Sequence, residues 1–306
     1  MMKRRILTLV LASLSIPCSV PAISTFAHAE LFLSLEVRES YDDNVIGLTA
    51  DNRAGTTGPA RGGMAGVSGQ SLKGGLDGIP GPGGGGSGSG TTGTSTAVEQ
   101  KGDFSTNLYA NIGYDRDLGE RTTTFLEVSV DHTRFSTYSD FDFTIGTASA
   151  GATRRLSDIL SVRAAAHCSW KNFENDLRDG TAYGAGIALR ERFSPSFWAK
   201  QFYDVEQNSA DSPDYSYFGQ SAGIAAGYDV TDASTLSVGY TYFLRDYREI
   251  APAVTVTSQL ASLDLMTDLS ASWSVSIGYE HEWADSNIPG TATTNNRYRV
   301  GIRYDY

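Results

Sequence analysis

The sequence has no long apolar run and is poor in methionine, cysteine and charge. Of its 306 residues, 4 are methionine, 2 are cysteine and 19% are charged, and the mean hydropathy is −0.24. A membrane-spanning helix needs roughly 18 or more consecutive apolar residues, so an α-helical membrane protein is excluded. A wholly disordered chain is also disfavoured, because it would combine few aromatic residues with high net charge, whereas this chain has 16 tyrosines. An all-β protein remains.

The N-terminus has the pattern of a secretory signal peptide. Basic residues at positions 3–5 precede an apolar run at 6–16, and Ala27 and Ala29 supply small residues at a cleavage position. A membrane anchor is the alternative, but the run is short and is followed by Pro17 and Pro21. Residues before Cys18 also lack the pattern that lipid attachment needs. We therefore expect residues 1–29 to be a signal peptide, residues 30–306 to be the mature chain, and the protein to be exported.

The charge and the cysteine count restrict the ligands. The net charge is −11, and removal of residues 1–29 takes away basic residues and no acids, so nucleic acid is not an expected partner. Only Cys168 would remain after cleavage, which leaves no intramolecular disulfide. No His and Cys spacing resembles a zinc or haem site, and the glycines at 83–86 lack the context of a phosphate loop. We expect no cofactor and no metal.

Apolar residues alternate with polar ones along most of the chain, which is the pattern of strands with one apolar face. In the first block, Leu31, Leu33, Leu35 and Val37 share a face. The block at 141–145 begins with three apolar residues at period two, and the block at 254–265 shows its apolar face only from Ala261 onward. Twelve strands are predicted, around residues 31–37, 106–114, 126–130, 141–145, 160–170, 183–189, 197–205, 218–228, 236–244, 254–265, 273–283 and 298–306.

Residues 46–102 break this alternation. They carry 17 of the 33 glycines between Gly55 and Gly93, so they have too little apolar surface to order themselves. Elsewhere short turns alternate with longer polar loops, and both chain ends fall on the short-turn side. This arrangement, with an even number of strands, predicts a transmembrane up-and-down antiparallel β-barrel with a long disordered first loop. A soluble β-sandwich is the alternative, but its strands are typically ~5 to 6 residues long, and these apolar faces are longer.

Two segments resemble outer-membrane β-barrel proteins. The run Tyr41-Asp42-Asp43-Asn44-Val45 after the first strand is similar to the start of porin-like barrel families known mostly from sequence, some of them associated with exopolysaccharide genes. The alternation from Tyr298 to the terminal Tyr306 resembles the signal that the outer-membrane insertion machinery reads. The resemblance implies the bacterial outer membrane, with the lipid bilayer, lipopolysaccharide and that machinery as partners. It implies no particular substrate.

If the apolar faces point to lipid, charged side chains of both signs line the lumen. One interpretation is a charged pore, with a basic track where the last strand closes on the first. The other is that Glu280 and Glu282 pair with Arg297 and Arg299 and only stabilise closure. The predicted lumen-lining residues are Arg38, Arg163, Lys171, Arg190, Arg192, Arg297, Arg299, Arg303, Glu280 and Glu282.

His167-Cys168-Ser169 is the one arrangement that suggests catalysis. Outer-membrane phospholipase A, which it resembles, is a twelve-stranded barrel with a His and a Ser two residues on, facing lipid. Here the alternation sends His167 and Ser169 to the lumen, and no orienting third group is evident. We therefore expect no enzymatic activity, although a lipid hydrolase is kept as a minor alternative.

The sequence thus predicts a narrow passive channel or export conduit that prefers anions. An anionic solute or a polysaccharide is the expected type of partner. The alternative from another class is a non-conducting structural or surface-interaction barrel.

Overall fold

The computed structural model describes residues 29–45, 102–174, 176–249, 253–287 and 292–306. The predictions of a signal peptide at 1–29 and of a disordered glycine-rich loop at 46–102 lie outside the described residues, apart from their last positions, Ala29 and Gly102. Within the described part of the chain, no helix is long and apolar enough to cross a membrane.

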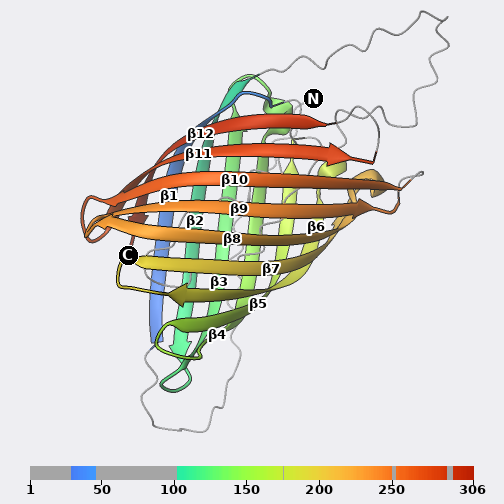
Figure 1. Cartoon of the computed structure of the whole chain (residues 1–306). Coiled ribbons are helices and arrows are strands. Elements are labelled where there is room, and N and C mark those ends of the chain that lie inside the picture. Colours follow the sequence, from blue (N-terminus) through green and yellow to red (C-terminus); the bar gives the residue numbers. More distant parts are fainter. Residues whose placement is uncertain (1–28, 46–101, 175, 250–252, 288–291) are drawn as a thin grey trace, which may run out of the picture.

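Twelve antiparallel strands close into a single barrel (Figure 1). Each strand pairs with its neighbours in the chain, and β12 pairs with β1, so among the described strands no edge is left unpaired. The strands are β1 (Ala29–Asp42), β2 (Asp103–Asp117), β3 (Thr122–Phe135), β4 (Phe143–Arg155), β5 (Leu160–Phe173), β6 (Gly180–Arg192), β7 (Phe197–Ala210), β8 (Tyr217–Thr231), β9 (Ser234–Tyr247), β10 (Val254–Asp268), β11 (Trp273–Ser286) and β12 (Thr293–Asp305).

The predicted fold class and the number of strands are confirmed, but the strands are longer than their apolar faces suggest. Each has 13 to 15 residues, against the ~9 to 11 that a tilted strand needs to cross a bilayer. Most of the added residues are polar and lie toward the strand ends, where the hydrophobic pattern stops but backbone pairing continues.

The connections differ between the two ends of the barrel. At the short-turn end, tight turns join the strands. In the first of these turns Gly119 has a positive φ of 112°, a backbone conformation that would be strained for a residue with a side chain. At the long-loop end, single 3₁₀ turns are built into three of the connections, at Ser139–Phe141, Asp176–Arg178 and Pro213–Tyr215.

The outer surface is apolar, with aromatic side chains toward the strand ends. Ile224, Ile277 and Val300 are each 60% exposed. Trp273 and Tyr304 pack at a tilt near the short-turn end, with ring centroids 5.0 Å apart, and Tyr279 and Tyr298 pack in the same way near the middle of β11 and β12, 5.3 Å apart. Flanking aromatic girdles around an apolar band are typical of outer-membrane barrels.

The inner surface is polar over much of the barrel, but apolar side chains of β4 and β10 also lie inside it, and those of β4 contradict the expected pattern. Phe143 and Ile145 were expected on an outward apolar face, and instead they are buried inside. Val254 and Val256 are also buried, and the outward face of β10 begins only at Thr255 and becomes apolar from Ala261. These apolar residues pack with one another inside the barrel rather than facing outward.

Candidate functional site

A buried ionic network links β1 to β12 and to the neighbouring strands β11 and β10. We call it the seam cluster, and its residues are Asp42, Asp264, Glu280, Arg297 and Arg299. Arg297 donates from Nε to Asp42 Oδ1 at 2.8 Å and from Nη1 to Glu280 Oε2 at 2.7 Å. Arg299 lies 2.8 Å from the second oxygen of Glu280 and donates to Asp264 at 2.5 Å. Two cations thus meet three carboxylates, so the cluster holds no excess positive charge.

Two further arginines of the predicted basic track also have acidic partners. Arg38 donates to Glu36 two residues earlier on β1, at 2.7 Å, and both side chains are buried. Arg303 lies 2.8 Å from Asp305 near the short-turn end. The geometry therefore corresponds to the ion-paired alternative for the region where β12 meets β1. Glu280 is the shared acceptor there.

Glu282 is buried one inward position further along β11. It lies opposite Leu260 of β10 and Asn295 of β12, within electrostatic reach of Arg297 and Arg245. It therefore adds a further buried carboxyl group beside the seam cluster.

A second polar network lies on the inner face of β5, β7 and β8. Lys171 donates to Glu206 at 3.2 Å and to Asn208 at 3.1 Å, and the Tyr217 hydroxyl donates to the same Glu206 oxygen at 2.8 Å. All four side chains are buried. This network, like the seam cluster, balances a cation with a carboxylate.

His167 and Ser169 are buried on this same wall but do not form a catalytic pair. Ser169 Oγ lies 2.9 Å from the Thr147 hydroxyl, whereas the ring nitrogens of His167 lie 3.9 Å from Asp204 and 3.7 Å from Glu206. In the described structure no hydrogen bond joins His167 to Ser169. A serine nucleophile needs its base within hydrogen-bond reach, so this geometry gives no support to a hydrolase.

Arg163, Arg190 and Arg192 differ in their partners. Arg163 is buried, donates to Glu127 at 2.9 Å, and its guanidinium lies 3.4 Å from the centre of the Phe125 ring. Arg192, exposed at the short-turn end, lies 3.8 Å from Asp229. Arg190 is half-buried, and its Nε atom is buried with no hydrogen-bond partner among the described residues.

Lys200 faces Arg190 directly across the β6–β7 pair. Within the described residues, neither side chain has a carboxylate in ion-pair contact. The charged groups that act on Lys200 are Arg163 and Arg190, both cations. Asp229, which lies 3.8 Å from Arg192, also acts on Arg190 but without ion-pair contact. Arg190 and Lys200 are thus a pair of like charges with no carboxylate of the described residues bonded to either, in contrast to the seam cluster.

Several inward aromatic rings cover glycines of the next strand. A side chain at Gly227 would meet the Trp198 ring, one at Gly223 would meet Phe202, and one at Gly151 would meet Phe125. The rings therefore lie along the wall instead of across the lumen. Sequence reasoning missed these contacts. Once the register between two strands is known, an inward aromatic residue directly opposite an inward glycine indicates such a contact.

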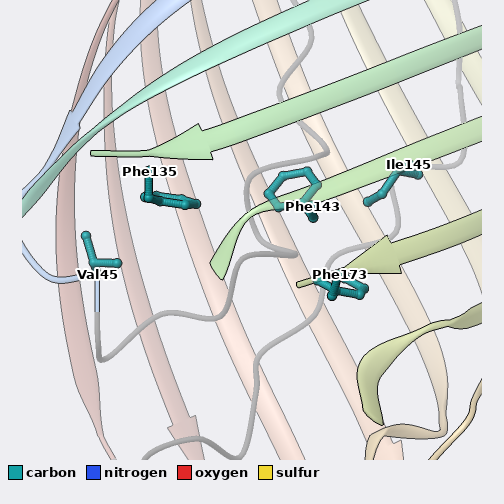
Figure 2. Close-up of a cluster of buried hydrophobic side chains, with 5 residues drawn as sticks. All are labelled: Val45, Phe135, Phe143, Ile145 and Phe173. Atoms are coloured by element: carbon teal, nitrogen blue, oxygen red, sulfur yellow. The ribbon is translucent and has the colours of Figure 1, made fainter. Parts of the chain in front are cut away.

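Apolar residues fill part of the interior at the long-loop end. We call Val45, Phe135, Phe143, Ile145 and Phe173 the mouth cluster; its side chains gather near the ends of β1, β3, β4 and β5 (Figure 2). A smaller cluster joins two tyrosines and two valines on β8, β9 and β10, namely Tyr217, Tyr247, Val254 and Val256. Sequence periodicity alone did not reveal either cluster.

Within the part of the chain that the structure describes, no group of three or more His, Cys, Asp or Glu side chains is arranged to hold a metal ion. The outward histidines have other contacts: His132 Nδ1 lies 2.9 Å from the Thr144 hydroxyl, and His281 packs against Trp283 at 4.1 Å.

No family model matches the chain, and no curated protein matches its sequence. Solved structures do match its fold. An outer-membrane channel from Pseudomonas putida F1 superposes with a TM-score of 0.54 at 10% identity, covering 95% of this chain and 99% of that one. The deltaS2 mutant of the TodX monoaromatic hydrocarbon channel gives 0.45 at 7% identity, with 90% of each chain covered. The NanC porin gives 0.43 at 12% identity, with 65% of this chain and 93% of that one covered. The fold comparison rests on the first of these, and the chain has the fold of an outer-membrane β-barrel.

Proposed function

We propose that this protein is a narrow passive channel in the bacterial outer membrane, with a preference for anions. The observation that carries the proposal is the contrast between the two surfaces of the barrel. Outside, isoleucine, valine and leucine side chains are exposed between aromatic residues. Inside, charged and hydroxyl-bearing side chains line much of the wall, together with glycines. An apolar belt suits lipid, and a polar interior suits water and solutes.

The inner faces of β6 and β8 support a passage rather than a filled core. Inward positions of β6 include Ala182, Gly184, Gly186 and Ala188, and those of β8 include glycine, serine and alanine from 219 to 227. Barrels of ~8 strands are filled by their side chains, and those of ~16 to 18 leave wide channels. Twelve strands with small residues on part of the wall and rings laid over glycines fit a narrow lumen.

Anion preference follows from the position of the uncompensated charge. The seam cluster and the Lys171 network balance their cations with carboxylates, whereas Arg190 and Lys200 do not. Fixed charge inside a low-dielectric wall focuses the field along a narrow passage. The excess positive charge on β6 and β7 would therefore attract anions.

The non-conducting barrel is the second candidate, and the mouth cluster is the observation that favours it. Phe143 and Phe173 are 2% and 3% exposed, so apolar packing closes part of the interior at the long-loop end. Such a barrel would present its loops to external partners, for example lipopolysaccharide. The insertion machinery is an expected partner under both proposals.

Conductance in planar lipid bilayers separates the two candidates. Protein whose folding is verified by a heat-dependent shift in gel mobility should produce discrete channel events, and heat-denatured protein from the same preparation should not. In a salt gradient, the reversal potential should indicate anion preference. Absence of channel events from verified folded protein would reject the channel in favour of the non-conducting barrel.

A further inference from the structure

Arg190 and Lys200 occupy directly opposed positions on β6 and β7. Like charges directly opposite in a sheet destabilise it, and the effect is larger where the surroundings are partly removed from water. Both side chains are half-buried. A pair of cations in this position is favourable when an anion lies between or above them.

The surrounding charges relieve this repulsion only in part, because Asp229 acts on Arg190 electrostatically but makes no ion pair with it among the described residues. Arg163 is already bonded to Glu127, and the carboxylate of Asp229 lies beside Arg192. On the same strand as Lys200, the next inward carboxylate is Asp204, which faces His167 instead. The described part of the chain therefore leaves two cationic groups available on one stretch of wall.

Aromatic faces adjoin both cations. The guanidinium of Arg190 lies 5.2 Å from the centre of the Trp198 ring, and the ammonium of Lys200 lies 5.9 Å from the centre of the Phe202 ring. Because these rings cover Gly227 and Gly223, they are laid along the wall between β7 and β8. Two cations beside two ring faces can hold a ligand that carries both an anionic group and a flat apolar face.

We propose that Arg190, Lys200, Trp198 and Phe202 form a binding subsite for small cyclic carboxylates. The cations bind the carboxylate by charge-assisted hydrogen bonds, and the ring of the ligand packs on Trp198 or Phe202. The subsite adds a solute class to the proposed channel function. Only transport of such a solute rests on that function. Binding itself requires a folded barrel and no conduction.

Trp198 provides the optical probe. The chain has four tryptophans, and the other three, Trp170, Trp273 and Trp283, are exposed on the outer surface. Folded protein in detergent should change its tryptophan emission on titration with glucuronate or benzoate, the first a sugar carboxylate and the second an aromatic one. Glucose and benzyl alcohol are the matched neutral compounds, and potassium chloride at equal ionic strength is the control for anion binding without a ring.

The expected result is saturable binding of at least one of the two carboxylates, with at least tenfold weaker binding of its neutral match. Arg190→Gln combined with Lys200→Gln should weaken that binding at least tenfold. Glu36→Gln combined with Arg38→Gln, which removes a balanced pair elsewhere on the wall, should leave it unchanged. In Trp198→Phe the emission change should disappear while calorimetry still detects the ligand, because phenylalanine keeps a ring face.

Several results would overturn the subsite. These are no saturable binding of either carboxylate by folded protein, equal binding of the neutral compound, or equal binding by the Arg190 and Lys200 double variant. The two proposals fail separately: conductance without carboxylate binding rejects the subsite alone, and binding without conductance rejects the channel alone.

Discussion

Asp42 and Arg297 face each other across the β1–β12 pair, and the Nε–Oδ1 distance of 2.8 Å joins the first strand to the last. Both side chains are buried, and the same guanidinium also reaches Glu280. Closure of the barrel therefore brings together charges that are more than 250 residues apart in sequence. The pair is a structural element of the seam, because each ion would be costly to bury alone.

This relationship predicts a large loss of stability on Arg297→Gln. The change leaves Asp42 and Glu280 without their shared cation, so the free energy of unfolding should fall by about 3–5 kcal/mol. Urea titration of the barrel in detergent measures it. Arg134→Gln is the control: Arg134 is 74% exposed and lies 3.8 Å from Asp142, and loss of such a pair should change stability by less than about 1 kcal/mol. Equal losses would show that the seam cluster adds no special stability.

The orientation of β9 makes a second prediction. Val238 is 51% exposed on the outer surface, whereas its neighbour Ser237 faces inward opposite Asp264 and Gly227. Val238→Arg should destabilise the barrel by about 2–4 kcal/mol in a lipid bilayer, the cost of a cation near the midplane. Ser237→Arg adds the same side chain beside a carboxylate and should cost far less. Comparable unfolding free energies for both variants would mean that the strand has the opposite orientation.

The alternation of apolar and polar residues predicts much of this structure, but not all of it. The number of strands and most outward faces follow from period-two hydrophobicity, because lipid requires an unbroken apolar surface. That rule fails for Phe143 and Ile145, since an apolar residue at a strand end can also pack inside against Phe135 and Phe173. Periodicity reports that a face is apolar, and does not report which side of the sheet it occupies.

The partners of the charged residues were less predictable than their positions. Alternation placed Arg297, Arg299 and Glu280 on one face, but the bonds of Arg297 to Asp42 and of Arg299 to Asp264 depend on the register between strands. A shift of register by two residues would keep every side chain on its face and exchange all its neighbours. The same dependence explains why the absence of a carboxylate beside Arg190 and Lys200 could not be read from the sequence.

The contact between Trp198 and Gly227 makes a third prediction. A side chain at position 227 would overlap the indole ring, so Gly227→Val should displace the ring and cost about 1–3 kcal/mol of stability, as overpacking typically does. In a Trp198→Ala background the same valine has no ring to displace. The cost should then shrink, and the double-mutant cycle should give a coupling energy close in size to the cost of Gly227→Val alone and opposite to it in sign. Additive effects would mean that the ring does not lie over this glycine.

The last prediction concerns charge selectivity, and it follows from which cations lack acidic partners. Arg190→Gln with Lys200→Gln removes two positive charges from a stretch of wall where, among the described residues, no carboxylate forms an ion pair with either. The reversal potential in a salt gradient should therefore move toward the cation-selective direction. Glu36→Gln with Arg38→Gln removes one charge of each sign from a bonded pair, leaves the net charge of the wall unchanged, and should not move it. Both variants must first show the heat-dependent gel shift of a closed barrel. Removal of fixed charge from a narrow low-dielectric passage changes which ions it attracts. Equal reversal potentials for the wild-type protein and the Arg190 and Lys200 variant would therefore show that these two cations do not set selectivity.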